Sequence, residues 1–266
     1  MKILNIRMIK PVLHYFNLAD EVVSFSTTRH GGVSKGKLAT LNINPHRGDE
    51  PSAVAENLQA VAAEIGVQAD KVIRLHQIHE THCLIVTDAF LNLSAAEQYE
   101  MEEGKDAVVT DCRNVCIGVH TADCVPILFY DPVHHAIGAA HAGWRGTVQR
   151  IAQHTLRKMT ELYGTDPKEL KAVVGPCISQ KNFEVGQEVY DAFSAAGFPM
   201  ERIARMYEKW HINLPLCNQL QLEELGVLTA NILQSGICTY DNASDFFSAR
   251  ILKEGFGTIY TGIALK

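Results

Sequence analysis

Apolar residues recur along this chain with two spacings, and each spacing predicts one type of secondary structure. Val54, Leu58, Val61 and Ile65 follow the helical period, with Gly66 at a suitable end, so residues 51–65 are predicted to form an amphipathic helix. Similar stripes predict helices over 144–164, 184–197 and 214–236. In the helix over 144–164, we expect the apolar face to run from residue 148 to residue 162.

Short, nearly continuous apolar runs predict β-strands that are buried on both faces. Four such runs follow one another closely at residues 106–110, 115–120, 125–130 and 136–141. Further strands are expected over 21–28, where paired glycines at 31–32 end the run, and over 72–75, 83–86, 171–174 and 257–265.

The order of these elements indicates a fold class. The strands come in a block with helices inserted, and the pattern shows no internal repeat and no long linker rich in Pro, Gly or Ser. We therefore expect residues 1–266 to form a single α+β or layered α/β domain. The regular strand–helix alternation of a doubly wound sheet is not present.

Composition and charge narrow the class of protein. The 266 residues are 47% hydrophobic and 20% charged, with a net charge of -6 and no block rich in Lys or Arg, so nucleic-acid binding is not expected. No apolar run approaches the ~18 residues of a membrane span, and residues 1–21 resemble mature sequence rather than a signal peptide. Seven irregularly spaced cysteines argue against a disulfide framework and favour a cytoplasmic protein with reduced thiols.

Two polar residues stand at the ends of neighbouring predicted strands. Cys124 precedes the run 125–130, and His141 ends the run 136–141 just before a Gly-containing segment. If the two strands form a hairpin through a turn at Asp131, pairing of Tyr130 near residues 135–137 would bring Cys124 opposite or close to His141. Pro126 cannot donate a ladder hydrogen bond, which indicates an edge strand or an irregular start of the strand.

A thiol and an imidazole held close together permit several chemistries. With a histidine from the segment HQIHETH, which contains His76, His79 and His82, they would form a three-ligand zinc site with one open position. Alternatively, Cys124 could be a nucleophile with His141 as its base. A third reading is a buried cysteine with only a packing role.

Four other residues are candidates for binding a substrate or phosphate. Arg29 lies beside the paired glycines, whose amides could also hold an anion, and Arg145 begins a predicted helix next to His141. Arg250 is a third candidate, and Gln77 could hydrogen-bond a base or sugar. Each could equally be an ordinary surface or loop residue.

A series of motifs resembles one known family. The chain carries TLNI, GDEPSAVAEN, HQIH, TADCVPILFYDP, AAHAGWRGT, GPCI, FEVG and FFSAR in order, after STTRHGGVSKG. Together they resemble the multicopper polyphenol oxidase (laccase) domain family, also described as a family of purine nucleoside phosphorylases, from about residue 20 to residue 266. The TADC and HAGWRG pair is the most specific part.

The resemblance implies a fold and a metal site. It implies a four-layer α/β/β/α sandwich of mixed sheets, similar to the catalytic domain of cytotoxic necrotising factors. It also implies a zinc-centred catalytic site whose ligands are His79, Cys124 and His141, since His79 and not His76 matches the Gln-x-His element. Asp123 could steady these ligands or cap a turn. The chain lacks the repeated His-x-His clusters of a multicopper oxidase, so copper is disfavoured.

The activities that the resemblance implies are phosphorolysis of adenosine, inosine, guanosine and methylthioadenosine, and deamination of adenosine. The partners would be purine nucleosides and phosphate, and the protein a monomer or weak homodimer. Two alternatives remain open: a peptidoglycan-editing hydrolase acting on cell-wall precursors, and a binding protein with a vestigial site. Glu80, Leu58 and Asn213 depart from the family pattern, which puts substrate preference in doubt more than the zinc ligands.

Overall fold

The structure is a computed structural model that describes residues 9–266. The first eight residues of the segment expected to be mature sequence lie outside the described residues. Across the described part of the chain, no helix has both the length and the apolar character needed to cross a membrane.

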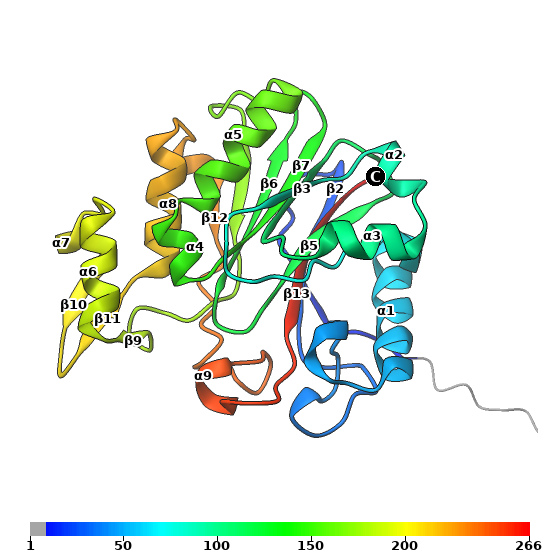
Figure 1. Cartoon of the computed structure of the whole chain (residues 1–266), viewed down its shortest axis with the longest axis horizontal. Helices are drawn as coiled ribbons and strands as arrows, with labels where there is room; N and C mark the ends of the chain where they lie inside the picture. Colours follow the sequence, from blue (N-terminus) through cyan, green and yellow to red (C-terminus); the bar gives the residue numbers. More distant parts are fainter. Residues whose placement is uncertain (1–8) are drawn as a thin grey trace, which may run out of the picture.

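Two β-sheets form the centre of the protein (Figure 1). The first is antiparallel, in the order β1-β2-β13-β5, and consists of β1 (Leu13–Tyr15), β2 (Val22–Thr27), β5 (Cys116–Thr121) and β13 (Ile259–Leu265). The second is mixed, in the order β12-β8-β6-β7-β4-β3, and consists of β3 (Cys83–Ile85), β4 (Ala107–Thr110), β6 (Val125–Asp131), β7 (Ala136–Ala142), β8 (Lys171–Val174) and β12 (Ile232–Gln234). Their inner faces share one buried cluster, in which Ile117 and Ile263 of the first sheet pack with Leu128 of the second.

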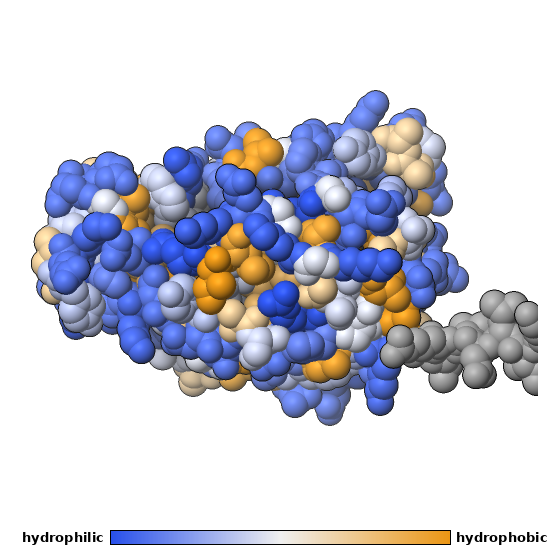
Figure 2. Space-filling view, turned by 90° about the horizontal axis from the view of Figure 1, so that it is seen from below, coloured by the Kyte–Doolittle hydropathy of each residue, from blue (hydrophilic) through white to orange (hydrophobic). Residues whose placement is uncertain are grey.

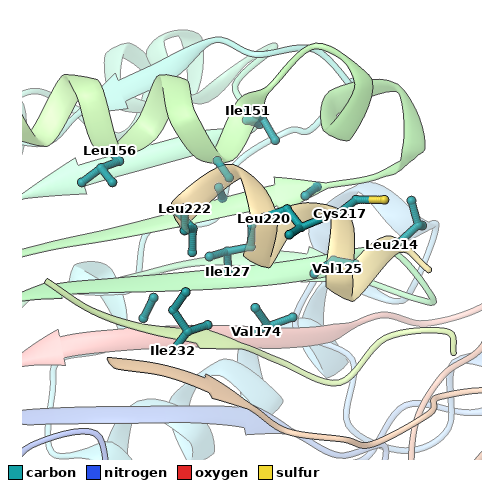
Figure 3. Close-up of a cluster of buried hydrophobic side chains, with 14 of the residues drawn as sticks. Val125, Ile127, Ile151, Leu156, Val174, Leu214, Cys217, Leu220, Leu222 and Ile232 are labelled. Carbon is teal, nitrogen blue, oxygen red and sulfur yellow. The ribbon is translucent and has the colours of Figure 1, made fainter. Parts of the chain in front are cut away.

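Helices cover the outer face of each sheet. Helix α1 (Pro51–Ile65) packs Val61 and Ile65 into a cluster with Phe25 and Tyr260 of the first sheet. On the second sheet, α5 (Ile151–Tyr163) and α8 (Leu214–Glu224) bury their apolar faces on β6 and β8, as Figure 3 shows. The layers therefore run helix, sheet, sheet, helix, which confirms the predicted four-layer α/β architecture. The similarity to cytotoxic necrotising factors stays a prediction.

Shorter elements surround these layers. They are the helices α2 (Asp88–Leu91), α3 (Ala95–Glu102), α4 (Trp144–Val148), α6 (Gln187–Ala195), α7 (Met200–Ile203) and α9 (Ala249–Leu252), and the 3-10 turns η1 (Gly36–Leu38), η2 (Pro45–Arg47), η3 (Ala69–Lys71) and η4 (Thr229–Asn231). A small antiparallel sheet, β10-β11-β9, consists of β9 (Glu184–Val185), β10 (Ala204–Met206) and β11 (Trp210–Ile212). Figure 1 places it beside α6 and α7, away from the two large sheets.

Three predicted elements differ in the structure. The helix expected over 144–164 is two helices, because Arg150 takes a left-handed backbone (φ 64°) between α4 and α5, and Leu162 is 40% exposed rather than buried. Residues 72–75 form a single bridge, from Val72 to Cys116, instead of a strand, although Val72, Ile73 and Leu75 are buried. The helix expected over 214–236 ends near Gly226 (φ 97°), and residues 232–234 pair in parallel with β8.

Candidate metal centre and cavity

Three side chains that could hold a metal ion converge at one end of the second sheet. The ligand atoms of His79, Cys124 and His141 all lie within 4.8 Å of one another. Two imidazoles and a thiol are ligands that suit zinc, and three protein ligands leave one position open. The residues predicted to form the ligand set are therefore together, while His76 lies outside the group: its Nδ1 is 2.5 Å from Glu103 and its ring stacks on His46.

The β6–β7 hairpin brings two of these ligands together. Tyr130 pairs with Ile137 and Pro126 with His141, so Cys124 stands just before the paired segment on the side of His141. The turn follows the expected chemistry, since the Asp131 side chain accepts hydrogen bonds from the amides of residues 133 and 134. Strand β6 is an inner strand, so the edge position considered for Pro126 is wrong. Pro126 is instead the second residue of β6, one position beyond the residues that pair with β8, where its carbonyl accepts from the amide of Gly175 (2.9 Å).

Asp106 joins the third ligand to the other two. Its buried carboxylate accepts hydrogen bonds from the backbone amides of Ile78, His79 and Glu80 (3.1, 3.0 and 2.9 Å), and it lies 2.7 Å from Nδ1 of His141. One carboxylate thus fixes the loop that carries His79 and leaves Nε2 of His141 to face the thiol. Sequence reasoning missed this residue. The available signal was an aspartate directly before the apolar run of residues 107–109, where a charged group needs partners.

Electrostatics at the cluster favour a thiolate. Burial alone would raise the pKa of Cys124, but attraction to His141 and hydrogen bonds with His141 and His79 lower that pKa to about 6. Burial alone would lower the pKa of His141, yet the Cys124 thiolate and the Asp106 hydrogen bond raise it to about 9. Burial would raise the pKa of Asp106, but hydrogen bonds from His141 and the loop amides hold it below its ordinary value. A thiolate is the form that binds a metal or acts as a nucleophile.

Two neighbouring residues keep the cluster in place. A Cβ on Gly143 would come 2.9 Å from Cδ2 of His79 and 3.2 Å from Sγ of Cys124, so this position has room for glycine alone. Asp123, directly before Cys124, accepts hydrogen bonds from the hydroxyls of Thr239 and Ser248 and from the amide of Arg250, at the start of α9. Asp123 therefore caps a turn and ties the cysteine to the C-terminal segment.

A cavity of about 250 Å³ opens beside the cluster. His79, Cys124 and His141 form part of its lining. The rest comes from segments distant in sequence, and its polar members are Asn44, His46, Arg47, His76, Gln77, His120, Thr121 and Thr258. Sequence reasoning selected Gln77 from this set, considered His76 only as a metal ligand, and missed the others. Residues 44–47 and 258 reach the cavity only through the packing of the first sheet.

The three predicted arginines do not line this cavity. Arg29 donates to the carbonyls of Ala39 and Ala243, and the amide of Gly32 donates to Thr40, so these groups are used within the protein. Arg145 is exposed and stacks on its neighbour Trp144. Arg250 is exposed and donates to the carbonyl of residue 184. The three arginines therefore lie outside the lining of this cavity, and their predicted contact with a substrate or phosphate stays a prediction.

Gln77 lines the cavity but its side chain is occupied. Its amide nitrogen donates to the carbonyl of His120 (2.8 Å), and its oxygen accepts from the His120 amide (2.7 Å). Gln77 therefore joins the His79 loop to β5, and its predicted contact with a base or sugar stays a prediction.

The three departures from the family pattern have local explanations. Glu80 is exposed and donates its backbone amide to Asp106. Leu58 is buried against the first sheet. Asn213 caps α8, because its side chain accepts from the amide of Leu216 (3.1 Å). None of the three side chains lines the cavity.

Comparisons with known proteins agree with this architecture. The family model described as multi-copper polyphenol oxidoreductase laccase matches residues 23–266. A purine nucleoside phosphorylase from Bacteroides thetaiotaomicron is 40% identical over 96% of this chain and 97% of its own length. Adenosine deaminase RL5, from an unknown prokaryotic organism, is 35% identical over 96% of this chain and 98% of its own.

Two solved structures have the same fold as this chain. The hypothetical protein YfiH from Bacillus licheniformis superposes with a TM-score of 0.89 at 29% identity, covering 98% of both chains. YlmD from Geobacillus stearothermophilus superposes with a TM-score of 0.87 at 29% identity, covering 94% of both. The motifs, the sandwich and these matches together show that the chain belongs to the multi-copper polyphenol oxidoreductase laccase family.

Proposed function

We propose that this protein is a zinc-dependent purine nucleoside phosphorylase that also deaminates adenosine. The observation that carries the proposal is the cluster of His79, Cys124 and His141 in the lining of a small-molecule cavity. Relatives that align with 96% of the chain bear the names of these two activities. The substrates we propose are adenosine, inosine, guanosine and methylthioadenosine.

The donor set fits zinc. Two imidazole nitrogens and the sulfur of Cys124 lie within 4.8 Å of one another, and the pKa of the Cys124 thiol is lowered. Asp106 fixes the ring of His141 through Nδ1. When bound, zinc supplies Lewis acidity at the open position of such a three-ligand set. Copper also binds nitrogen and sulfur ligands, but the chain lacks the His-x-His clusters of multicopper oxidases, so we propose zinc.

A second candidate is a cysteine hydrolase that acts on cell-wall precursors. The pairing of a Cys124 thiol of pKa about 6 with a His141 of pKa about 9 favours it. This is the thiolate–imidazolium arrangement that cysteine nucleophiles use.

The first test is to incubate zinc-quantified protein with adenosine and phosphate beside a Cys124→Ala variant, and to identify the products by mass. We expect adenine with ribose 1-phosphate, and inosine, all absent from the variant. If zinc-loaded protein forms none of these products, the nucleoside proposal fails and cell-wall precursors become the next substrates to assay. Zinc retained at full stoichiometry by the variant would instead show that Cys124 is no ligand.

The proposal also covers domain organisation, cellular compartment and oligomeric state. We propose a single domain over residues 1–266 that works in the cytoplasm as a monomer or weak homodimer, without nucleic-acid or membrane partners. The seven free cysteines support the reducing compartment. The face shown in Figure 2 is mostly hydrophilic, with hydrophobic residues in separate patches, which supports the absence of a large permanent interface there.

A further inference from the structure

One part of the cavity lining is basic and lies outside the metal cluster. It consists of His46, Arg47 and His120, together with the amide of Asn44 and the hydroxyl of Thr258. Among the residues that the structure describes, no carboxylate lines the cavity. Burial lowers the pKa of His46 and His120 and so favours their neutral rings, which leaves Arg47 as the positive charge of this part of the lining. A small cavity with one guanidinium among neutral polar groups is suited to an anion.

Arg47 is held in position by groups that leave most of its donors unused. Its Nε donates to the carbonyl of Phe256 (3.0 Å), and its guanidinium lies 4.2 Å from the centre of the Phe256 ring. Within residues 9–266, its two terminal nitrogens have no hydrogen-bond or ion-pair partner. A guanidinium fixed through Nε and stacked on a ring presents its terminal N–H groups as a fork, which is the geometry that binds phosphate.

His120 contributes a second unused group. The ring is 4% exposed, and in the described part of the chain its Nε2 is buried without a hydrogen-bond partner. Its Nδ1 lies 3.3 Å from the hydroxyl of Thr258, which in turn accepts from the Asn44 amide (3.3 Å). In the tautomer in which the Thr258 hydroxyl accepts from Asn44 and donates to Nδ1, the neutral ring carries its own proton on Nε2. A buried donor that lines a cavity without a partner needs a ligand to satisfy it.

We propose that Arg47 and His120 bind the inorganic phosphate that attacks the nucleoside. The inference rests on the proposed function and assigns the phosphate subsite of that cavity. A phosphate oxygen forms a bond to ribose C1′ while the C1′–N9 bond breaks and its electron pair stays on the purine. The proton of hydrogen phosphate passes to the departing base, so the products are the free purine and ribose 1-phosphate.

This assignment replaces the earlier candidates for phosphate binding. Arg29, Arg145 and Arg250 bond to backbone carbonyls or stack on neighbouring rings outside the cavity lining. Arg47 is the arginine in the lining formed by the described residues. Phosphate held there shares one cavity with the side chains of the metal cluster, so the subsite and the cluster can contact the same nucleoside.

The test compares a reaction that needs phosphate with one that does not. In zinc-loaded protein we expect Arg47→Gln to weaken inorganic phosphate binding, measured by calorimetry, and to raise the phosphate KM by roughly 10- to 100-fold, as for loss of a charged hydrogen bond. Adenosine deamination, which consumes no phosphate, should lose less of its rate than phosphorolysis does in the same variant. The matched control is Arg202→Gln, an exposed arginine of α7 that does not line the cavity, which should leave both reactions unchanged.

A second pair of variants tests His120 without relying on Arg47. His120→Gln places an N–H near the position of Nε2 and should keep phosphate affinity, whereas His120→Asn has no group there and should lose about tenfold. Unchanged phosphate affinity in both Arg47→Gln and His120→Asn would overturn the inference while leaving phosphorolysis intact. Phosphate binding that depends on Arg47 in a protein that cleaves no nucleoside would support the subsite and refute the proposed function.

Discussion

The substitution Asp106→Asn tests whether one carboxylate holds the candidate metal site together. Asp106 is fully buried and accepts four hydrogen bonds, three from loop amides and one from His141. An asparagine has one acceptor oxygen, so in either orientation its NH₂ group faces backbone N–H donors and at least two of these bonds are lost. Hydrogen bonds to a buried charge contribute about 1.5–3 kcal/mol each, so the loss of two should lower the free energy of unfolding by about 3–6 kcal/mol.

The effect on the metal should accompany the effect on stability. Without the carboxylate, Nδ1 of His141 loses its partner and the loop carrying His79 is released, so zinc affinity should fall by about 10- to 100-fold. Urea unfolding of the zinc-free protein and a zinc competition titration measure the two quantities. A matched control is Asp245→Asn, which removes the exposed pairing with His30 and should cost at most about 1 kcal/mol.

The pH dependence gives a further check on the same carboxylate. Because hydrogen bonds hold the pKa of Asp106 below its unfolded value of about 3.9, its ionised form stabilises the native state above that pH. The contribution is lost as pH falls through the lower, folded-state pKa, so the difference between wild type and variant should shrink in acid. A variant with zinc affinity within threefold of wild type and a stability loss below about 1 kcal/mol would refute this reasoning.

Three further predictions concern Cys124, the neighbouring Gly143 and Leu156 in the hydrophobic core. In zinc-free protein, alkylation of Cys124 followed by mass spectrometry should reach half its maximal rate near pH 6, and zinc should block it; a midpoint above pH 8 would contradict the ion pair. Gly143→Ala should lower zinc affinity at least tenfold, because its Cβ meets His79 at 2.9 Å, whereas Gly146→Ala, with no contact below 3.4 Å, should leave affinity unchanged in the same titration. Leu156→Ala, in the core under α5, should cost about 2–5 kcal/mol in urea unfolding without changing zinc affinity; a loss of zinc would show that the core and the site are coupled.

Local patterns were sufficient to predict the hairpin and its two ligands. Apolar runs on both sides of an Asp-Pro turn limited the partner of Tyr130 to residues 135–137, and each of these registers brings Cys124 near His141; the structure has Ile137. The same apolar runs predicted a single α+β or layered α/β domain, whereas the four layers were implied by the resemblance to the family. In contrast, the His79 assignment depended on the family motif, since nothing in the spacing alone separates it from His76.

The missed features depend on contacts between distant segments. Asp106 is recognisable as a ligand-positioning residue only when the loop 78–80 has folded over it. Arg29 and Arg47 both lie near glycines in sequence, yet the packing of Phe256 directs Arg47 to the cavity, and the carbonyls of residues 39 and 243 hold Arg29 away from it. The break at Arg150 likewise depends on tertiary contacts, since its guanidinium donates to the carbonyl of Ala196 (2.9 Å).

The attachment of the His79 loop to Asp106 has a consequence for the thermodynamics of metal binding. His79 is exposed, and a ligand on an exposed loop would ordinarily lose conformational entropy when it captures an ion. Here the backbone amides of residues 78–80 are bonded to the carboxylate of Asp106, which directly precedes β4 of the second sheet. The loop backbone is therefore already ordered when the chain folds. Binding of the ion then costs little more than the conformational entropy of one imidazole ring. The rigid sheet thereby raises the affinity of the metal site at the end of its strands.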